Sequence, residues 1–229
     1  MKNVLFGTFA ALLLLTSCEK NNGGDPKPPD AVSYNNKTEG SMWLYHQSSD
    51  NNGTTDQSDY TITSTGRDTT INNKSYHIYD RSFGGNQYLA VSGSNYFQYD
   101  SLPAGLGDVI ERLYLKVNAP KGATWSQDVS VEVPVGGIPF NVTVTINNKI
   151  EDTGLTRTVG GNDYTDVIHV STVLSLKGAV PGATLTSDIH TYYAPDYGMI
   201  ENSTAVAVSF LGVQQSVNST TTLKSATLK

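Results

Sequence analysis

The stretch Val129–Ile146, with the sequence VSVEVPVGGIPFNVTVTI, decides the fold class of this chain. Apolar residues occupy every second position on both sides of Gly136-Gly137. Strict alternation over so many residues indicates β-strands that bury one face. The Gly-Gly pair is typical of a two-residue hairpin turn. Pro134 and Pro139 cannot donate ladder hydrogen bonds, so we expect this end of the hairpin at an edge or rim of the sheet.

Short alternating segments and tight turns continue on both sides of this hairpin, and no convincing helical periodicity interrupts them. Ser48–Ser58 is rich in Asn, Asp, Thr and Gly and is predicted to form a loop. Further turns are predicted at Asn72-Asn73, Gly93-Ser94, Asn147-Asn148 and Gly160–Asp163. Successive tight turns place neighbouring strands side by side, so the sequence predicts an all-β antiparallel meander of about twelve strands. That number is too large for a flat open sheet, so the meander must curve into a half-barrel or open barrel, or fold over as a β-sandwich.

The first residues of the chain predict export and a lipid anchor. Lys2 precedes the apolar segment Phe6–Leu15, which is too short to span a bilayer and is typical of a signal peptide. Leu15-Thr16-Ser17-Cys18 resembles the lipobox of bacterial lipoproteins, which implies cleavage after residue 17 and lipidation of Cys18. Residues 18–33 are rich in Pro, Gly and Asn and are predicted to be a tether. Residues 34–229 are predicted to be one all-β domain.

Charge and cysteine content narrow the possible partners. The formal net charge is −6, which argues against nucleic acid because phosphate binding needs clustered Lys and Arg. Cys18 is the single cysteine, so the core must hold the fold without an internal disulfide. The membrane is the expected partner through the anchor. Glu19 follows the cysteine where Asp would indicate inner-membrane retention, which by resemblance favours the outer membrane; the periplasmic and cell-surface sides both stay open.

The segment Ile189–Glu201, IHTYYAPDYGMIE, resembles a Tyr-Tyr-Ala-Pro-x-x-Gly motif found in Bacteroidetes-type lipoproteins of unknown function. Trp43-Leu44-Tyr45 and Gly122–Trp125 match two weaker elements of the same pattern. Asp196 stands where that pattern has Gly, and Glu201 stands where it has Lys. The resemblance implies a curved antiparallel sheet related to the half-barrel of lipoprotein carriers such as LolA. It brings no catalytic residues with it.

The residues that could carry chemistry are scattered along the sequence. The histidines are His46, His77, His169 and His190, and no two have the spacing of metal ligands. His77 and His169 are expected on the polar faces of their strands. Asp50–Asp59 is rich in oxygen ligands but fails the EF-hand pattern. With no Gly-x-Ser-x-Gly motif and no suitable acid pair, we predict no enzyme, no cofactor and no metal. A metal site assembled across strands stays open.

Aromatic residues are the main indication of a binding site. Those selected as candidate ligand contacts are Trp43, Tyr45, Tyr192, Tyr193 and Tyr197. Exposed aromatics on a curved sheet can line an apolar groove or stack on sugars, whereas buried ones pack the sheet. The leading hypothesis is a non-catalytic envelope protein that binds a hydrophobic, lipid-like ligand or a partner protein. The alternative is a surface glycan-binding accessory lipoprotein.

Overall fold

The computed structural model describes residues 32–229 apart from residues 52, 103–108, 136–137, 179–181 and 211–212. The predicted signal peptide, Cys18, most of the tether and the Gly136-Gly137 turn therefore lie outside the described residues. No helix in the described part of the chain has the length and apolar character needed to cross a membrane.

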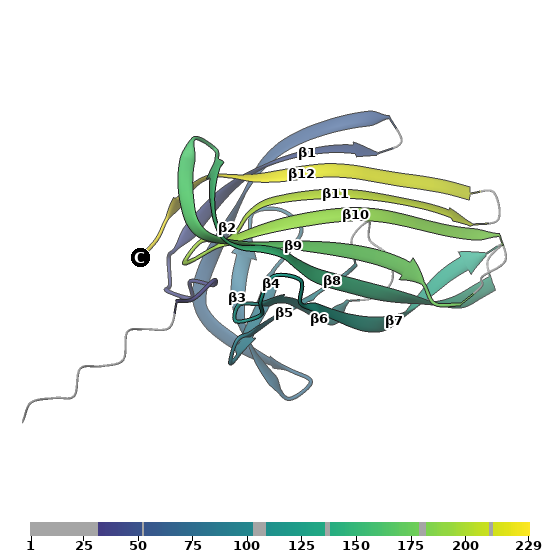
Figure 1. The fold of residues 1–229 in the computed structure, drawn as a ribbon, viewed down its shortest axis with the longest axis horizontal. Coiled ribbons are helices and arrows are strands. Elements are labelled where there is room, and N and C mark those ends of the chain that lie inside the picture. Colours follow the sequence, from purple (N-terminus) through teal and green to yellow (C-terminus); the bar gives the residue numbers. More distant parts are fainter. Residues whose placement is uncertain (1–31, 52, 103–108, 136–137, 179–181, 211–212) are drawn as a thin grey trace, which may run out of the picture. The chain divides into compact units, whose positions relative to one another are not determined.

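Residues 32–229 fold as a single antiparallel sheet of twelve strands (Figure 1). The strands are β1 (Met42–Asn51), β2 (Thr54–Ile71), β3 (Lys74–Arg81), β4 (Gln87–Ser92), β5 (Asn95–Asp100), β6 (Ile110–Lys116), β7 (Thr124–Val135), β8 (Ile138–Val159), β9 (Asn162–Leu176), β10 (Ala183–Ala194), β11 (Gly198–Phe210) and β12 (Val213–Thr227). Their order across the sheet is β6-β5-β4-β3-β2-β1-β12-β11-β10-β9-β8-β7. The sheet is a meander nearly closed into a barrel, so the predicted fold class is confirmed in its curved form and not as a β-sandwich.

Tight turns occur where the sequence predicted several of them. Asn72 and Asn73 have φ of 50° and 61°, the left-handed geometry that a two-residue hairpin turn requires. Gly93-Ser94 and Gly160-Gly161 also connect consecutive strands. Asn147-Asn148 does not, and that prediction was wrong: both residues lie inside β8, which runs unbroken over 22 residues. Their side chains bond across to β9 instead. The side-chain amide oxygen of Asn148 accepts from the Thr172 hydroxyl at 2.8 Å, and the side-chain amide nitrogen of Asn147 donates to the Ser175 hydroxyl at 3.2 Å.

The predicted loop at Ser48–Ser58 was also wrong. β1 and β2 form a continuous ladder from Met42↔Thr63 to Asn51↔Thr54, so their polar ends form a long hairpin. Backbone pairing needs no apolar side chains where neither face must be buried, which is why the polar composition misled the prediction.

Side chains close the gap between the two edge strands of the meander. The Trp125 indole Nε1 donates to the Leu113 carbonyl at 2.8 Å, and the Gln127 amide donates to the Glu111 carbonyl at 2.7 Å. Both bonds run from β7 to β6, and they replace a backbone ladder at this position. We call this contact the seam. It satisfies edge carbonyls that would otherwise be open to another chain.

The far end of the β8–β9 hairpin, residues 152–167, bends away from the sheet toward β1 and β12 (Figure 1). We call it the β8–β9 tip. Register shifts in β8 and positive φ at Gly154 and Asp166 produce the bend. The Arg157 guanidinium holds the tip through two 2.8 Å hydrogen bonds to the Glu201 carboxylate. Glu201, which departs from the lipoprotein motif, is thus half of a fork-like ion pair.

Residues 33–41 cross one end of the sheet and form what we call the strap. The Asp196 amide donates to the Ser33 carbonyl at 2.6 Å, and the Tyr34 hydroxyl donates to the Asp166 carbonyl at 2.6 Å. The Tyr34 amide in turn donates to the Tyr96 hydroxyl at 3.0 Å. Tyr34 is buried and joins β5 to β9 through these two bonds, while Ser33 joins the strap to the turn before β11.

The absence of a side chain at Gly160 allows the β8–β9 tip to approach the backbone of β12 closely, and this can be tested. A Cβ at Gly160 would lie 2.4 Å from the Leu223 carbonyl oxygen, whereas a Cβ at Gly161 would meet nothing within 4 Å. Both residues have positive φ. We expect Gly161→Ala to lower the free energy of unfolding by about 1 kcal/mol through backbone strain, and Gly160→Ala to lower it by a further ~1–3 kcal/mol through the clash. Urea unfolding of both variants checks this, and equal midpoints would contradict the close approach.

Candidate ligand-binding site

A cavity of about 620 Å³ lies against the inner face of the curved sheet. All twelve strands contribute to its lining. On β10 the lining residues are Ile189, Thr191 and Tyr193, and on β12 they are every second residue from Val217 to Thr221. That alternation fits side chains on one face of a strand, so the cavity occupies the inside of the curve. Its volume is within the range of about 300–1,000 Å³ typical for small-ligand sites.

The structure brings four of the five predicted aromatic residues to this cavity. Trp43, Tyr45, Tyr193 and Tyr197 line it. Tyr192 lies on the opposite face of β10, where its ring stacks on His169 at 4.3 Å between centroids. The Arg157 guanidinium lies 3.5 Å above the same ring, so Tyr192 supports the ion pair that holds the β8–β9 tip. Adjacent residues on a strand point to opposite faces, which separates Tyr192 from Tyr193.

The aromatic lining is packed and carries hydroxyl groups. Trp43 and Tyr45 are buried, and the Tyr45 hydroxyl donates to the Met199 carbonyl at 2.7 Å. Burial raises the pKa of Tyr193 to about 12, so its hydroxyl stays protonated and able to donate. These packed rings therefore bring hydroxyl groups as well as apolar ring faces to the lining of the cavity.

Side-chain amides and hydroxyls make up much of the remaining lining. The amide residues are Asn35, Asn36, Gln47, Gln87, Gln98, Gln127, Asn148 and Asn202. Some are fixed by neighbours: the Asn202 amide donates to the Thr191 hydroxyl at 2.9 Å, and Thr204 donates to the Asn202 carbonyl oxygen. Such fixed amides present hydrogen-bonding groups in set directions, which is what a polar ligand requires.

Three charged side chains belong to the lining in the described residues: Arg81 on β3, Asp100 on β5 and Arg112 on β6. The sequence reasoning missed them. It separated a face with Leu113, Leu115 and Val117 from a face with Arg112 and Tyr114, and the structure turns Arg112 and Tyr114 toward the cavity. Alternation is normally interpreted with the apolar face inside the fold. Because polar residues face the interior here, alternation alone could not identify these charged residues as part of the lining.

The aliphatic part of the interior is already filled by the chain itself. A cluster from β7 to β11 buries Val131 and Val144 to 2% exposure and Leu174 to 1%. Leu102, which follows β5, packs into the same cluster. Most of this apolar surface is occupied by neighbouring side chains, while Leu102, Ile146 and Ile189 of the cluster also border the open space beside its polar groups.

Ser64, His77 and Asp68 have the connectivity of a catalytic triad. His77 Nε2 lies 2.8 Å from the Ser64 hydroxyl and His77 Nδ1 lies 2.7 Å from the Asp68 carboxylate. The Ser64 hydroxyl also lies 2.8 Å from the Lys37 carbonyl, and Ser64 is 1% exposed and not part of the cavity lining. A nucleophile without access to substrate cannot act, so this array fastens the strap to β2 and β3. His77 is 5% exposed, and its predicted position on a polar face was wrong.

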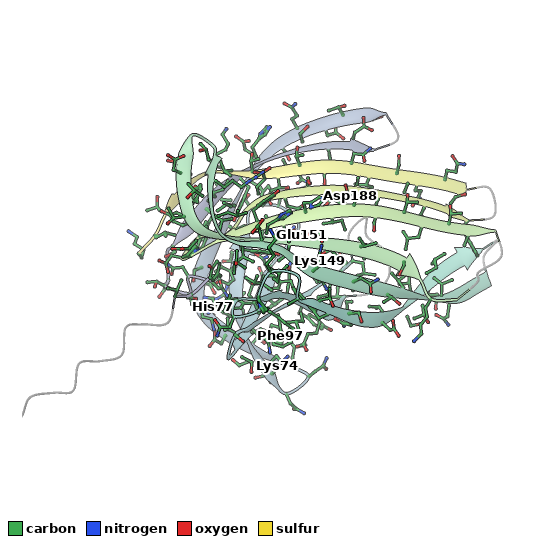
Figure 2. All side chains as sticks on the ribbon, viewed as in Figure 1. Lys74, His77, Phe97, Lys149, Glu151 and Asp188 are labelled. Carbon is green, nitrogen blue, oxygen red and sulfur yellow. The ribbon has the colours of Figure 1, made fainter. Side chains whose placement is uncertain are left out.

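The outer face of β8–β10 carries a second polar cluster. His169 Nε2 lies 2.9 Å from His190 Nδ1, and His190 Nε2 lies 3.0 Å from the Asp188 carboxylate. Glu151 accepts from the Ser171 hydroxyl and from Lys149, and Figure 2 shows Lys149 and Glu151 beside each other. Among the residues that the structure describes, no group of three His, Cys, Asp or Glu could hold a metal ion.

Lys74 makes a separate contact on β3 (Figure 2). Its ammonium lies 3.4 Å above the ring of Phe97 and 2.7 Å from the Glu111 carboxylate, which also accepts from the Tyr76 hydroxyl. Burial alone would raise the pKa of Glu111, but the hydrogen bonds from Lys74 and Tyr76 outweigh it and leave that pKa lowered. This group joins β3, β5 and β6 next to the seam.

Comparison with known proteins supports the fold. No family model matches the sequence, and no curated protein does. The structure is similar to a candidate lipoprotein of Parabacteroides distasonis ATCC 8503, with a TM-score of 0.51 and 16% identity over 86% of this chain and 100% of that chain. It also aligns with a candidate exported protein with a YmcC-like fold from Bacteroides fragilis NCTC 9343, with a TM-score of 0.49, 10% identity and the same coverage. At such identities the first likeness shows a shared fold, and the relation to LolA stays a prediction.

The His169–His190 contact predicts how stability depends on pH. Burial and then the neighbouring His190 lower the pKa of His169 below its ordinary value. The unfolded chain therefore binds this proton more readily, and stability falls as the pH drops below about 6.5, the ordinary histidine pKa. We expect His169→Gln to reduce this acid loss, measured by urea unfolding at pH 7.5 and pH 5.5. An NMR titration of the His169 ring with a midpoint at or above the ordinary value would contradict it.

Proposed function

We propose that this chain is a non-catalytic protein of the cell envelope, anchored through Cys18 to the outer membrane, whose interior cavity binds a saccharide. The lipobox-like sequence supports the anchor, and the shared fold with a candidate lipoprotein is consistent with it. The observation that carries the ligand class is the composition of the cavity lining: amides, hydroxyls and aromatic rings outnumber aliphatic side chains such as Ile146 and Ile189, and most of the aliphatic cluster is packed away from the open space.

A saccharide matches this lining in both of its chemical features. Its hydroxyls need donors and acceptors in fixed directions, which the cavity amides offer. Its C–H faces pack against aromatic rings, which Trp43 and Tyr193 offer from the wall. Phe83 belongs to the same lining and is 76% exposed, so it places a free ring where a longer sugar chain would leave the cavity.

A lipid-like ligand, the leading hypothesis from the sequence, has weaker support. A fatty chain needs an open apolar channel, since each buried CH₂ contributes about 0.8 kcal/mol. The side chains that could form such a channel, including Val131, Val144 and Leu174, pack against each other instead. Placing a chain along the amides would leave them without partners, at a cost of about 1–3 kcal/mol for each.

Gln47 and Gln57 provide a matched pair for testing the cavity. Gln47 on β1 lines the cavity, and Gln57 on β2 is exposed and pairs with the next residue of β1, which points to the other face. Residues 34–229 would be screened on a glycan array, and hits measured by calorimetry. We expect Gln47→Leu to weaken binding of a hit about five- to tenfold, the value of about one hydrogen bond, and Gln57→Leu to leave it unchanged.

The proposal fails if the array and calorimetry give no binding. It also fails if native mass spectrometry of the protein purified from its envelope finds a lipid-sized mass that denaturation releases. Equal effects of Gln47→Leu and Gln57→Leu would move saccharide binding away from this cavity.

A further inference from the structure

Four buried side-chain donor atoms lack a hydrogen-bond partner in the described residues. They are Asn35 Nδ2, Trp43 Nε1, Arg81 Nε and Arg112 Nε. All four residues line the same cavity. A buried donor without an acceptor costs about 1–3 kcal/mol, so four of them around one space are a strong deviation from ordinary packing. The residues around this cavity therefore carry four buried donors that no other described residue pairs.

The two arginines add positive charge to this set of unpaired donors. An Arg81 terminal nitrogen lies 3.8 Å from the Asp100 carboxylate, which is beyond hydrogen-bond distance. Arg112 has no ion-pair partner in the described part of the chain, although Asp100 is close enough to act on its charge. Two cations and one anion leave the lining with a net positive charge, in a chain whose formal net charge is −6.

The strand register places these groups on one connected stretch of the inner face. Trp43 pairs with Ile62, and Ile62 pairs with Arg81, so Trp43 and Arg81 lie in one cross-strand row. Arg112 pairs with Gln98, whose amide donates to Asp100 at 3.0 Å. Asp100 is on β5, between the strands that carry Arg112 and Arg81, and its carboxylate accepts from Gln98, while the Nε atoms of both arginines have no acceptor among the described residues.

We infer that the cavity binds a saccharide carrying an oxyanion group, with Arg81 and Arg112 as the residues that recognise its charge. This rests on the proposed saccharide function and narrows it to acidic sugars. A guanidinium presents a fixed fork of N–H donors that matches a carboxylate or sulfate oxygen pair. Trp43 Nε1 and Asn35 Nδ2 supply two further donors for the acceptor-rich ligand.

Arg112→Met tests the inference, with Arg67→Met as the control. Met is unbranched and similar in length, so it removes the charge while filling the space. Arg67 makes the same change of charge at an exposed position, where it contacts Asp80 at 3.3 Å outside the cavity. Calorimetry would compare three probes on each variant and on the parent chain: an oligogalacturonate, a sulfated oligosaccharide and a neutral oligosaccharide of the same length.

In the parent chain we expect at least one acidic probe to bind ten times or more tighter than the neutral one. Arg112→Met should abolish that preference and leave neutral binding within about twofold, and Arg67→Met should keep it. Preference for the uronate or for the sulfated sugar identifies the source of the oxyanion, and either supports the inference. Unfolding of the ligand-free protein adds a second test, because removing a buried cation without a partner should keep or raise the thermal midpoint.

Equal binding of acidic and neutral probes to the parent chain would overturn the oxyanion site while leaving the saccharide function in place. A marked fall in the thermal midpoint of ligand-free Arg112→Met would assign Arg112 to structural support and also overturn it. Failure of all three probes to bind would overturn both the inference and the proposed function.

Discussion

The structure depends on how the two edges of one long meander are brought together. A twelve-stranded sheet that curls on itself leaves β6 and β7 as free edges, and unpaired edges invite association with other chains. Trp125 and Gln127 bridge this seam by side-chain bonds to β6 carbonyls. A side chain reaches further than a backbone hydrogen bond, so β6 and β7 lie further apart at the seam than two strands joined by a backbone ladder. That wider spacing is compatible with an interior too large for its own side chains to fill.

Several local features reinforce the end of the sheet that the strap crosses. The strap is fixed by Tyr34 and by the Ser64 hydroxyl, which donates to the Lys37 carbonyl, and the β8–β9 tip is held by Arg157 and Glu201. Each uses polar side chains as structural ties, which explains why residues that look catalytic in isolation are buried and inaccessible. The polar groups that border the cavity lie instead inside the curve of the sheet.

The fold was predictable from the sequence to a larger extent than the site. Strict alternation around Gly136-Gly137 and positive-φ turns such as Asn72-Asn73 are local properties, and local properties can be read from a sequence. Asn147-Asn148 was misread because its side chains are satisfied by β9, a partner that lies far along the chain. The aromatic residues Trp43, Tyr45, Tyr193 and Tyr197 were placed in the cavity by strand register, whereas Arg81 and Arg112 could not be recognised before the curvature showed which face is interior.

The ladder between β1 and β12 joins the first and last strands of the described region, from Met42↔Thr227 to Asn51↔Val217. It lies in the middle of the sheet rather than at its edge, with six strands on either side of the β1–β12 boundary. Each half of the sheet is a six-stranded meander whose strands pair with neighbours in the sequence, so each half can begin to form on its own. The two halves become one sheet only when β1 pairs with β12, which closes nearly the whole chain into a loop. Such long-range closure is slow, so nucleation should be local and the final step of folding topologically late. A chain with this order of events remains an incomplete sheet until its last strand is available to pair with β1.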